Sequence, residues 1–588
     1  MTIDKRDFDA NRPLLQDIDA EQDTADRSVE RSRRHSRSSG NDGLLRSDDG
    51  LLSDVVEEIV ERDRRKMQKE VTRVLSFGWG VVTCLGAGSI TAFSLYGHLL
   101  LTRLHYSQLQ VNAVSIAAEL AMYLPVPLFG YLCDRYSPSP LAMFSGLVFG
   151  IGYLLAAFTY KSGPPVAAGG SGWPFWVMIL AFISIGESTK GIMLAVPIAA
   201  FGLSGMWQSQ LGMYLFYERL EDGSHGDLDV FKYFVFLALL LLGIGIIGTF
   251  VLRIVEDDDK YIDETVEELE RSGLLEESDF FQPRNEIRQA VEYGTFSGAL
   301  DEEQSALSDE EREQQRLEKE REEEERRKKN WLLNYETRVF LQDHTMWWLA
   351  AGFFLVTGPG ESYINNLGTI IPTLTPQSYP TGASPPAGSP STHVTTIALT
   401  STIARLLTGS LSDFFAPPAT HLFPPIPEGA RLTHPTSPSS SRLTLSRMTF
   451  LIPSAFLLSL GYLLLASPLP LAYPGIFNLT TALIGFGYGG AFSLAPIIIS
   501  VVWGVENFAT NWGIVAMMPA AGAALWGIVY SAAYQNAVDR GDGGSSDGQC
   551  RGWRCYGFWA VGCTVSVWVA VLVWLAAWRG WKRRGVVV

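Results

Sequence analysis

Residues Phe231–Ile254 read FKYFVFLALLLLGIGIIGTFVLRI, a run in which only Lys232 and Arg253 carry charge. About 20 apolar residues are enough to cross a hydrocarbon core of ~30 Å as a helix. The hydrocarbon core holds no water for unpaired backbone groups, so a spanning segment of this kind must be helical. This stretch therefore predicts a transmembrane helix, and the function must be one that a membrane protein performs.

The same pattern extends on both sides of this run. About ninety residues rich in Glu, Asp, Lys and Arg follow it, and Met346–Leu374 is then apolar again. Counted along the chain, the apolar stretches form six, a charged interruption and six more, which predicts an all-α membrane protein of two six-helix bundles. We expect a disordered cytosolic tail (1–74), an N-terminal bundle (75–254), a charged cytosolic loop (255–345), a C-terminal bundle (346–578) and a short cytosolic tail (579–588).

The composition limits the classes of partner. The chain has 588 residues, 47% of them hydrophobic, and a net charge of −16. Most of the acidic residues lie in the N-terminal tail and the central loop, so the net charge says little about partners. No basic stripe is interleaved with aromatic residues, so nucleic acid is not an expected partner. We expect the lipid bilayer and a small solute as partners, and no metal ion or cofactor.

Two cysteines, Cys550 and Cys555, share one predicted loop. A disulfide is expected if that loop lies in an oxidising compartment, and a pair of free thiols is an equally good reading. The sequence alone does not decide between them.

The fourth span is short. From Trp173 the apolar run reaches only Gly186 before Glu187 and Lys190 interrupt it, and the next run starts without a connecting loop. About fourteen residues do not complete a crossing. The segment is either a stub or a broken and tilted helix, or a piece of the chain is missing here, and we favour the last interpretation.

Basic residues flanking the spans predict the orientation. They cluster before the first span, in the connection between spans eight and nine, and after the last span. They include Arg64, Arg65, Lys66, Arg447, Arg579, Lys582 and Arg583. Both termini are therefore expected in the cytosol. The central loop contains Asp309–Lys329, in which acidic and basic residues alternate, and we read it as a hydrated connector in preference to a binding module.

A short motif occurs twice, at the end of the second span of each half. The first copy reads Gly130-Tyr-Leu-Cys-Asp134-Arg135 and the second Gly409-Ser-Leu-Ser-Asp413. Repetition at matching positions indicates an internal structural repeat. The glycine permits close helix approach, and the carboxylate can cap a helix of the opposite half. We expect a gate in which these residues hold one side of the molecule closed.

These motifs resemble the Gly-x-x-x-Asp-Arg loop of the major facilitator superfamily. Further stretches narrow the resemblance: Gly86–Gly97, Pro197–Gln210, Gly358–Gly368 and Gly485–Gly513. They are similar to the nodulin-like branch, and most similar to the fungal monocarboxylate-permease-homologue transporters. The resemblance implies twelve spans, transport without a defined substrate, and a vacuolar membrane. The family name is not evidence that monocarboxylates are carried.

Ionisable groups at membrane depth are costly and point to function. Glu361 lies in the glycine-rich part of span seven, where we expect an irregular, broken helix lining a cavity. Asn365 and Asn366 follow one turn later, with Tyr363 nearby. Together they could bind a polar solute, with Glu361 taking up a proton. Hydrogen bonding between helices is an equally good reading of the same residues.

Further polar residues are candidates of lower rank. Glu119 in span two, Gln208 in span five and Tyr96 in span one could line the cavity. Arg405 in span eight precedes Gly409 by one turn and could pair with Asp413 or Glu361, or reach the membrane interface. For Arg405 a structural role is favoured, and it is counted with Gly409 and Asp413 in the expected gate. Residues such as Gln208 more often satisfy one another between helices.

The sequence thus predicts a secondary active or facilitative transporter of a small polar or anionic solute in the vacuolar membrane. Alternating access by two rocking bundles is the expected mechanism. Nothing resembles a nucleotide-binding loop, so a gradient would drive transport, and protons are one candidate. A non-transporting sensor or scaffold on the same fold is the alternative. An enzyme is the weakest reading, since no catalytic constellation stands out.

Overall fold

The structure is a computed structural model. It describes residues 48–126, 128, 138–188, 198–219, 225–252, 335–374, 387–415, 444–504, 508–540, 550–586 and 588. Contacts divide the chain into two units, Met1–Val71 and Thr72–Val588. In the first unit, residues 48–71 are helical, within the segment for which we predicted disorder. All that follows concerns the second unit. The predicted domain boundaries stay predictions.

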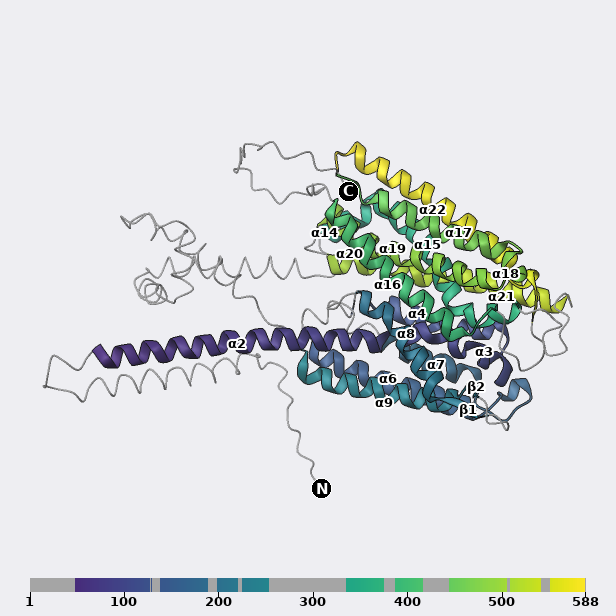
Figure 1. Ribbon diagram of the computed structural model, residues 1–588, viewed down its shortest axis with the longest axis horizontal. Coiled ribbons are helices and arrows are strands. Elements are labelled where there is room, and N and C mark those ends of the chain that lie inside the picture. The colour runs from purple at the N-terminus through teal and green to yellow at the C-terminus, as the bar shows by residue number, and fades with distance from the viewer. Residues whose placement is uncertain are drawn as a thin grey trace, which may run out of the picture. The chain divides into compact units, whose positions relative to one another are not determined.

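The residues that the structure describes are almost entirely helical (Figure 1). The first half contains α2 (Asp48–Ala87, of which residues 72–87 belong to the second unit), η1 (Gly88–Ala92), α3 (Phe93–Arg103), α4 (Gln108–Tyr123), α6 (Pro138–Lys161), η2 (Val166–Ala168), α7 (Phe175–Ser188), α8 (Ile198–Leu215), the antiparallel pair β1 (Tyr217–Arg219) and β2 (His225–Leu228), and α9 (Val230–Val251). The second half contains α14 (Tyr335–Gln342), α15 (His344–Thr373), α16 (Pro390–Phe414), α17 (Met448–Ala466), α18 (Leu469–Ala472), α19 (Gly475–Trp503), α20 (Phe508–Val515), α21 (Met517–Asp539), η4 (Trp553–Cys555) and α22 (Gly557–Arg583).

Eight helices in the described part of the chain are long and apolar enough to cross a membrane. The other four predicted spans are occupied by α4, α7, α8 and α15, which fall short for two reasons. The described residues of α4 and α7 number only 16 and 14. Helix α8 has 18 residues, which is long enough, but Gln208 and Gln210 lie within it. Helix α15 is 30 residues long, but Glu361, Asn365 and Asn366 lie within it. Helix α7 ends at Ser188, close to the predicted end of the short fourth span at Gly186.

The two halves repeat the same set of neighbouring helices, as the predicted internal repeat requires. In the first half α6 packs against α9 and α7, and α4 packs against α7. In the second half α17 packs against α22 and α19, and α16 packs against α19. In the order of spans, α4, α6, α7 and α9 of the first half correspond to α16, α17, α19 and α22 of the second half. Between the halves, α4 packs against α21, and α16 packs against α8. These two contacts are equivalent, because a pseudo-twofold axis that exchanges the halves converts one into the other.

Each half has its own apolar core. One buried cluster is built mainly from the helices of the first half, around Phe93, Tyr153 and Phe234, and the other from those of the second half, around Phe353, Tyr462 and Trp559. Large apolar side chains are exposed on α6, α9, α17 and α22, among them Ile151, Phe250, Phe456 and Leu572. A helix that is apolar on its exposed face as well as its buried one belongs in lipid.

Side-chain caps set where several helices begin. Ser107 and Gln110 form a reciprocal capping box at the start of α4, with the Ser107 Oγ accepting from the Gln110 N–H and the Gln110 Oε1 from the Ser107 N–H. Ser389 caps α16, whose first residue is Pro390, and Asp229 caps α9. Proline is suited to the first helical position because its missing N–H has no partner there in any case.

Helix α15 is continuous from His344 to Thr373, so our expectation of a broken helix at Glu361 is wrong. The glycines serve close packing instead. A Cβ on Gly358 would lie 2.6 Å from the Gly522 Cα of α21. Pro359 removes one backbone donor, and the Ser566 hydroxyl on α22 donates instead to the Leu355 carbonyl oxygen at 2.8 Å. Neighbouring helices thus replace the lost bond and keep α15 helical.

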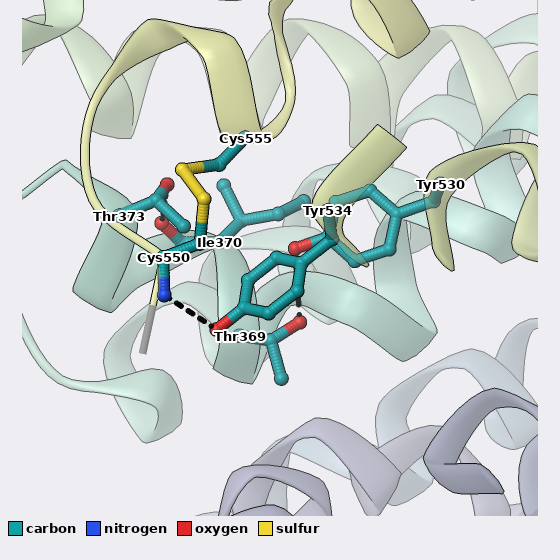
Figure 2. Close-up of a disulfide and its surroundings, with 7 residues drawn as sticks. All are labelled: Thr369, Ile370, Thr373, Tyr530, Tyr534, Cys550 and Cys555. Carbon is teal, nitrogen blue, oxygen red and sulfur yellow. Dashed lines mark hydrogen bonds between the residues drawn. A yellow bond between two sulfur atoms is a disulfide. The ribbon is translucent and has the colours of Figure 1, made fainter. Parts of the chain in front are cut away.

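Cys550 and Cys555 form a disulfide beside the end of α15, which decides between the two readings of this cysteine pair (Figure 2). The Cys550 N–H donates to the Tyr534 hydroxyl at 3.0 Å, and the Gly552 N–H donates to the Thr373 carbonyl oxygen at 2.7 Å. The crosslinked loop therefore ties α15 to α21 at one end of the second half.

The opposite end of α15 is held by Asp343. Its carboxylate accepts from the Thr345 N–H and hydroxyl, at 2.9 and 2.8 Å, and from the Arg584 guanidinium at 2.9 Å on each oxygen. The Trp503 indole N–H donates to it at 3.2 Å. Burial alone would raise the pKa of Asp343, but the bonds from Thr345 and Arg584 outweigh it, so the pKa lies below its ordinary value. This carboxylate joins α15 to the end of α22.

We expect Asp343→Asn to lower the free energy of unfolding by about 1–3 kcal/mol, because the charge-assisted pair with Arg584 is lost, while the asparagine side chain still caps α15. A carboxyl whose pKa is depressed by folding stabilises the protein above its unfolded pKa, about 4, and the stabilisation disappears as the pH falls through the lower folded pKa. Thermal melting in detergent between pH 7 and about pH 3 measures this. Asp539→Asn, at an exposed site, is the matched control. Equal melting of the Asp343 and Asp539 variants would contradict the assignment.

Candidate functional site

The candidate site lies where the two halves meet. Helix α3 packs against α15, α4 against α21, and α8 against α16. Gly368 brings α15 so close to α3 that an added Cβ would lie 2.2 Å from the Ser94 carbonyl oxygen. Several buried polar side chains hydrogen-bond across this interface, and they come from residues that the sequence marks as unusual for a membrane helix.

Two pairs of side chains interlock between α4 and α15. Glu119 and Tyr123 lie four residues apart on α4, and Glu361 and Asn365 lie four residues apart on α15, so each pair shares one face of its helix. The Asn365 amide donates to Glu119 Oε1, and the Tyr123 hydroxyl donates to Glu361 Oε1 at 3.2 Å. We call these four residues the crossed pairs. Each half thus contributes one carboxylate and one donor to the other.

Glu361 has a second donor within its own half. The Tyr488 hydroxyl on α19 donates to Glu361 Oε1 at 2.6 Å. Gly360 makes this approach possible, because a Cβ there would lie 2.5 Å from Tyr488 Cδ2. A carboxylate that accepts two hydroxyl bonds at membrane depth has its charge stabilised without water, and it can hold or release a proton between the halves.

Further bonds between the halves continue from the crossed pairs toward the end of α15. The Gln108 amide donates to Asn366 Oδ1 at 2.9 Å. The Asn112 amide donates to the Ser531 hydroxyl at 2.6 Å and to the Gly527 carbonyl oxygen at 2.9 Å on α21. Every one of these residues is buried or, for Gly527, faces the partner helix. The halves are therefore held together by polar bonds along this part of the interface.

Arg405 of α16 lies beside the crossed pairs and is only 8% exposed. Its guanidinium carbon is 5.8 Å from the Phe492 ring centroid, in cation–π range. It interacts electrostatically with Tyr488, Tyr123 and Glu361. Its own position is set by α19, whose Ser493 hydroxyl donates to the Arg405 carbonyl oxygen at 3.0 Å. A buried cation thus faces a buried carboxylate across the site.

A cavity opens between the halves at this point. Its empty volume is about 430 Å³, including space open to the surroundings. The lining combines η1 and α8 of the first half with α15, α16 and α19 of the second: Thr91, Gly202, Gly205, Ile364, Val394, Ile397, Ala398, Ser401, Arg405 and Tyr488. A mostly apolar hollow with a few polar groups is the usual form of a small-molecule site.

Known proteins with similar sequences are named probable transporters. No family model matches the chain. A curated relative from Aspergillus fumigatus, named probable transporter mch1, is 70% identical over 614 residues, covering 100% of this chain and 98% of the relative. Another of the same name from Neurospora crassa is 47% identical, covering 88% of this chain and 91% of the relative. The chain belongs to the MCH1 family. The MCH1 relatives are named as transporters and not as enzymes.

The fold comparison agrees with this membership. A bacterial homologue of the human lysosomal transporter Spinster, in an inward-facing and unoccupied conformation, matches with a TM-score of 0.51 at 12% identity, covering 87% of this chain and 98% of that one. At this identity the match shows the fold alone. The predicted major-facilitator fold of two helix bundles is confirmed, and so is the predicted resemblance to the fungal transporters.

The structure brings together four of the residues singled out in the sequence. Glu119, Glu361, Asn365 and Asn366 all lie at the interface between the halves, with Arg405 beside them. Sequence reasoning missed Tyr123, which lies one turn from Glu119 on the same face. It also missed Tyr488, which lies inside the quoted glycine-rich stretch of this MCH1-family chain. Spacing to Glu119 was the available signal for Tyr123; Tyr488 carried none beyond that stretch.

Three other candidates have partners within one half. The Tyr363 hydroxyl bonds to the Thr481 hydroxyl of α19 at 2.9 Å. Tyr96 packs against Phe234, with ring centroids 4.8 Å apart. The Gln208 amide donates to the Gly86 carbonyl oxygen at 2.9 Å and to the Ser204 hydroxyl at 3.1 Å. These contacts fit the reading in which such residues satisfy neighbouring helices of their own half.

The predicted gate is described only in part. Gly130, Asp134 and Arg135 lie outside the described residues. Asp413 is exposed, and its carboxylate lies 3.7 Å from Arg447 Nη2. A Cβ on Gly409 would lie 3.2 Å from the Ser493 hydroxyl oxygen, so α16 and α19 are close there. Among the described residues, no cluster of three or more His, Cys, Asp or Glu could hold a metal ion.

Proposed function

We propose that this protein carries a small polar or anionic solute across the vacuolar membrane by alternating access, and that protonation of Glu361 couples transport to a proton gradient. The two halves rock about the crossed pairs. One side of the protein is closed by the bonds between the halves seen here. In the alternate state the other side is closed by the gate residues Gly130, Asp134, Arg135, Gly409 and Asp413.

The observation that carries this proposal is the pair of buried carboxylates at the interface of the halves. Glu119 and Glu361 lie 2% and 7% exposed. A carboxylate at membrane depth is expensive to keep, and a purely structural contact between helices can be made by neutral side chains at lower cost. Since the Glu119 and Glu361 contacts each join one half to the other, separation of the halves and a change in protonation would affect the same bonds.

Two features support the proposed orientation of the chain in the membrane. The Cys550–Cys555 disulfide lies beside the end of α15, and disulfides persist in oxidising compartments. At the other end of the second half, α22 ends with Lys582 and Arg583 in its last turn, as expected for a cytosolic flank. Both features favour a lumenal disulfide and a cytosolic C-terminus, as in a vacuolar membrane.

Uptake into isolated vacuoles tests the proposal. Vacuoles that contain the protein and vacuoles that lack it would be compared across a panel of labelled amino acids, carboxylates, sugars and inorganic ions, with and without a proton gradient. We expect at least one solute whose flux depends on the protein and saturates with concentration. Correctly folded protein in the membrane that moves none of the panel would favour the alternative, a sensor or scaffold on the same fold.

A further inference from the structure

We propose that the cavity between the halves is an oxyanion site, in which Arg405 binds a carboxylate or phosphate group of the solute. This inference rests on the proposed transport function and names the chemical class of its solute. It follows from the arrangement of one cation and three hydroxyls in an otherwise apolar hollow.

The polar side chains that line the cavity are one cation and three hydroxyls. Arg405 is its charged lining residue, and the hydroxyl groups of Tyr488, Thr91 and Ser401 are its neutral polar side chains. The remaining lining residues are apolar or glycine. A guanidinium presents a planar set of donors that matches two oxygens of a carboxylate or phosphate. The three hydroxyls already donate, to Glu361 Oε1 and to the Gly88 and Ala398 carbonyl oxygens, so the guanidinium is the donor that the cavity offers to an oxyanion.

The first half leaves room for this chemistry by presenting glycines. A Cβ on Gly202 would lie 2.9 Å from an Arg405 guanidinium nitrogen. A Cβ on Gly205 would lie 2.5 Å from the Thr91 hydroxyl oxygen. Any larger residue at either position would push against the polar group that it faces. Helix α8 therefore contributes backbone and open space where α16 contributes charge.

The charge balance explains how anion binding and Glu361 would be linked. Facing Glu361 are Tyr123 and Glu119 from α4, Tyr488 from α19 and Arg405 from α16. While Glu361 is ionised, it offsets the charge of Arg405 across the site. When Glu361 takes up a proton, the site loses one negative charge, and a buried guanidinium whose compensating charge is reduced is disfavoured. An entering oxyanion restores the negative charge that Glu361 has lost, so one proton and one negative charge bind together.

Ligand-induced stabilisation of the purified full-length protein tests the site. The probes are matched acid and amide pairs, acetate with acetamide, propionate with propionamide and succinate with succinamide, together with inorganic phosphate. Thermal melting in detergent is followed for the wild type, Arg405→Gln, Arg405→Lys and the double variant Arg405→Gln/Glu361→Gln. Arg103→Gln, which removes an exposed guanidinium paired with Glu218, is the control. The double variant removes both opposite charges, so it keeps the test valid if Arg405→Gln alone does not fold.

We expect at least one acid or phosphate to raise the melting temperature of the wild type and of the control, while its amide partner does not. Arg405→Lys should bind that anion about 10-fold or more weakly, because the paired bonds of the guanidinium are lost. The double variant should show no shift. The probe that raises the melting temperature shows whether the site takes a carboxylate or a phosphate. Equal stabilisation by acid and amide, an unchanged anion response in the double variant, or no response of the wild type to any anion would overturn the oxyanion site.

The transport assay on the same preparation separates this inference from the proposed function. A neutral solute that is transported at the wild-type rate by the double variant would overturn the oxyanion site and leave transport standing. Anion binding that requires Arg405, without flux of any solute, would support the oxyanion site while removing transport itself.

Discussion

Replacing Glu361 by glutamine is expected to abolish solute accumulation driven by a proton gradient. In reconstituted vesicles, one proton carried per solute allows roughly tenfold accumulation for each pH unit imposed, in the simplest case without net charge movement. The glutamine amide still accepts bonds from Tyr488 and Tyr123, so the fold and the site are kept, but it neither takes up nor releases a proton. The accumulation ratio of the variant should fall to about one.

Exchange of labelled for unlabelled solute without a gradient is the companion measurement, and it should continue in Glu361→Gln. Glu218→Gln serves as the matched control, because Glu218 is a half-exposed carboxylate that pairs with Arg103 at 2.7 Å away from the site. A Glu361→Gln variant that accumulates solute as well as this control does would remove Glu361 from the coupling.

Gly358→Val is expected to prevent stable folding, and Gly358→Ala to lower the free energy of unfolding by about 1–3 kcal/mol. The reason is the contact between α15 and α21, where an added Cβ would lie 2.6 Å from the Gly522 Cα. Both atoms belong to backbone, so the helices must separate. That movement would also displace Glu361, less than one turn away.

Thermal melting and the yield of monodisperse protein measure this effect. Gly243→Ala on α9 is the matched control, since a Cβ there meets nothing within 4 Å. It exchanges the same atoms in the middle of another spanning helix, and it should melt at or slightly above the wild-type temperature. If Gly358→Ala melts with Gly243→Ala, the close helix contact does not limit stability.

The division into two helical halves could be predicted from the sequence because apolar length alone determines which segments fit a bilayer. The repeated Gly130–Asp134 and Gly409–Asp413 motifs predicted the internal repeat, which is seen in the matching helix neighbours of each half. Glu119 and Glu361 stood out for the same elementary reason, the cost of a carboxylate at membrane depth.

The partners of these carboxylates could not be predicted. A tyrosine in an apolar helix packs equally well in a core, as Tyr96 does, or beside a site, as Tyr123 does, and only the tertiary arrangement places its hydroxyl. A glycine in an apolar helix is equally hard to interpret, because it can break the helix or allow another helix to approach closely. We predicted that the glycines around Glu361 break span seven, whereas they let α15 approach α21 and Tyr488 within a continuous helix.

The short fourth span runs into the next span without a connecting loop. The alignment with the Aspergillus fumigatus relative extends over 614 residues against the 588 of this chain, so it contains positions at which the relative has a residue and this chain has none. We propose that some of them follow Ser188, where α7 ends. Sequencing the transcript across the codons for Ile185–Gly191 checks this, and an uninterrupted match to the present sequence would contradict it.

Covalent bridging of α8 to α16 tests most directly whether the halves must separate for transport. The Gln210 amide donates to the Thr395 hydroxyl at 2.7 Å across that interface. Cysteines at both positions, joined by a short bifunctional thiol reagent that a reductant reverses, would fix the halves together. A cysteine pair at Ser76 and Val251, whose contact lies within the first half, is the control, and the wild type carries the native disulfide through the same treatment. We predict that the Gln210–Thr395 bridge stops solute flux and that reduction restores it, while the control pair transports throughout; undiminished flux through fully bridged protein would contradict alternating access.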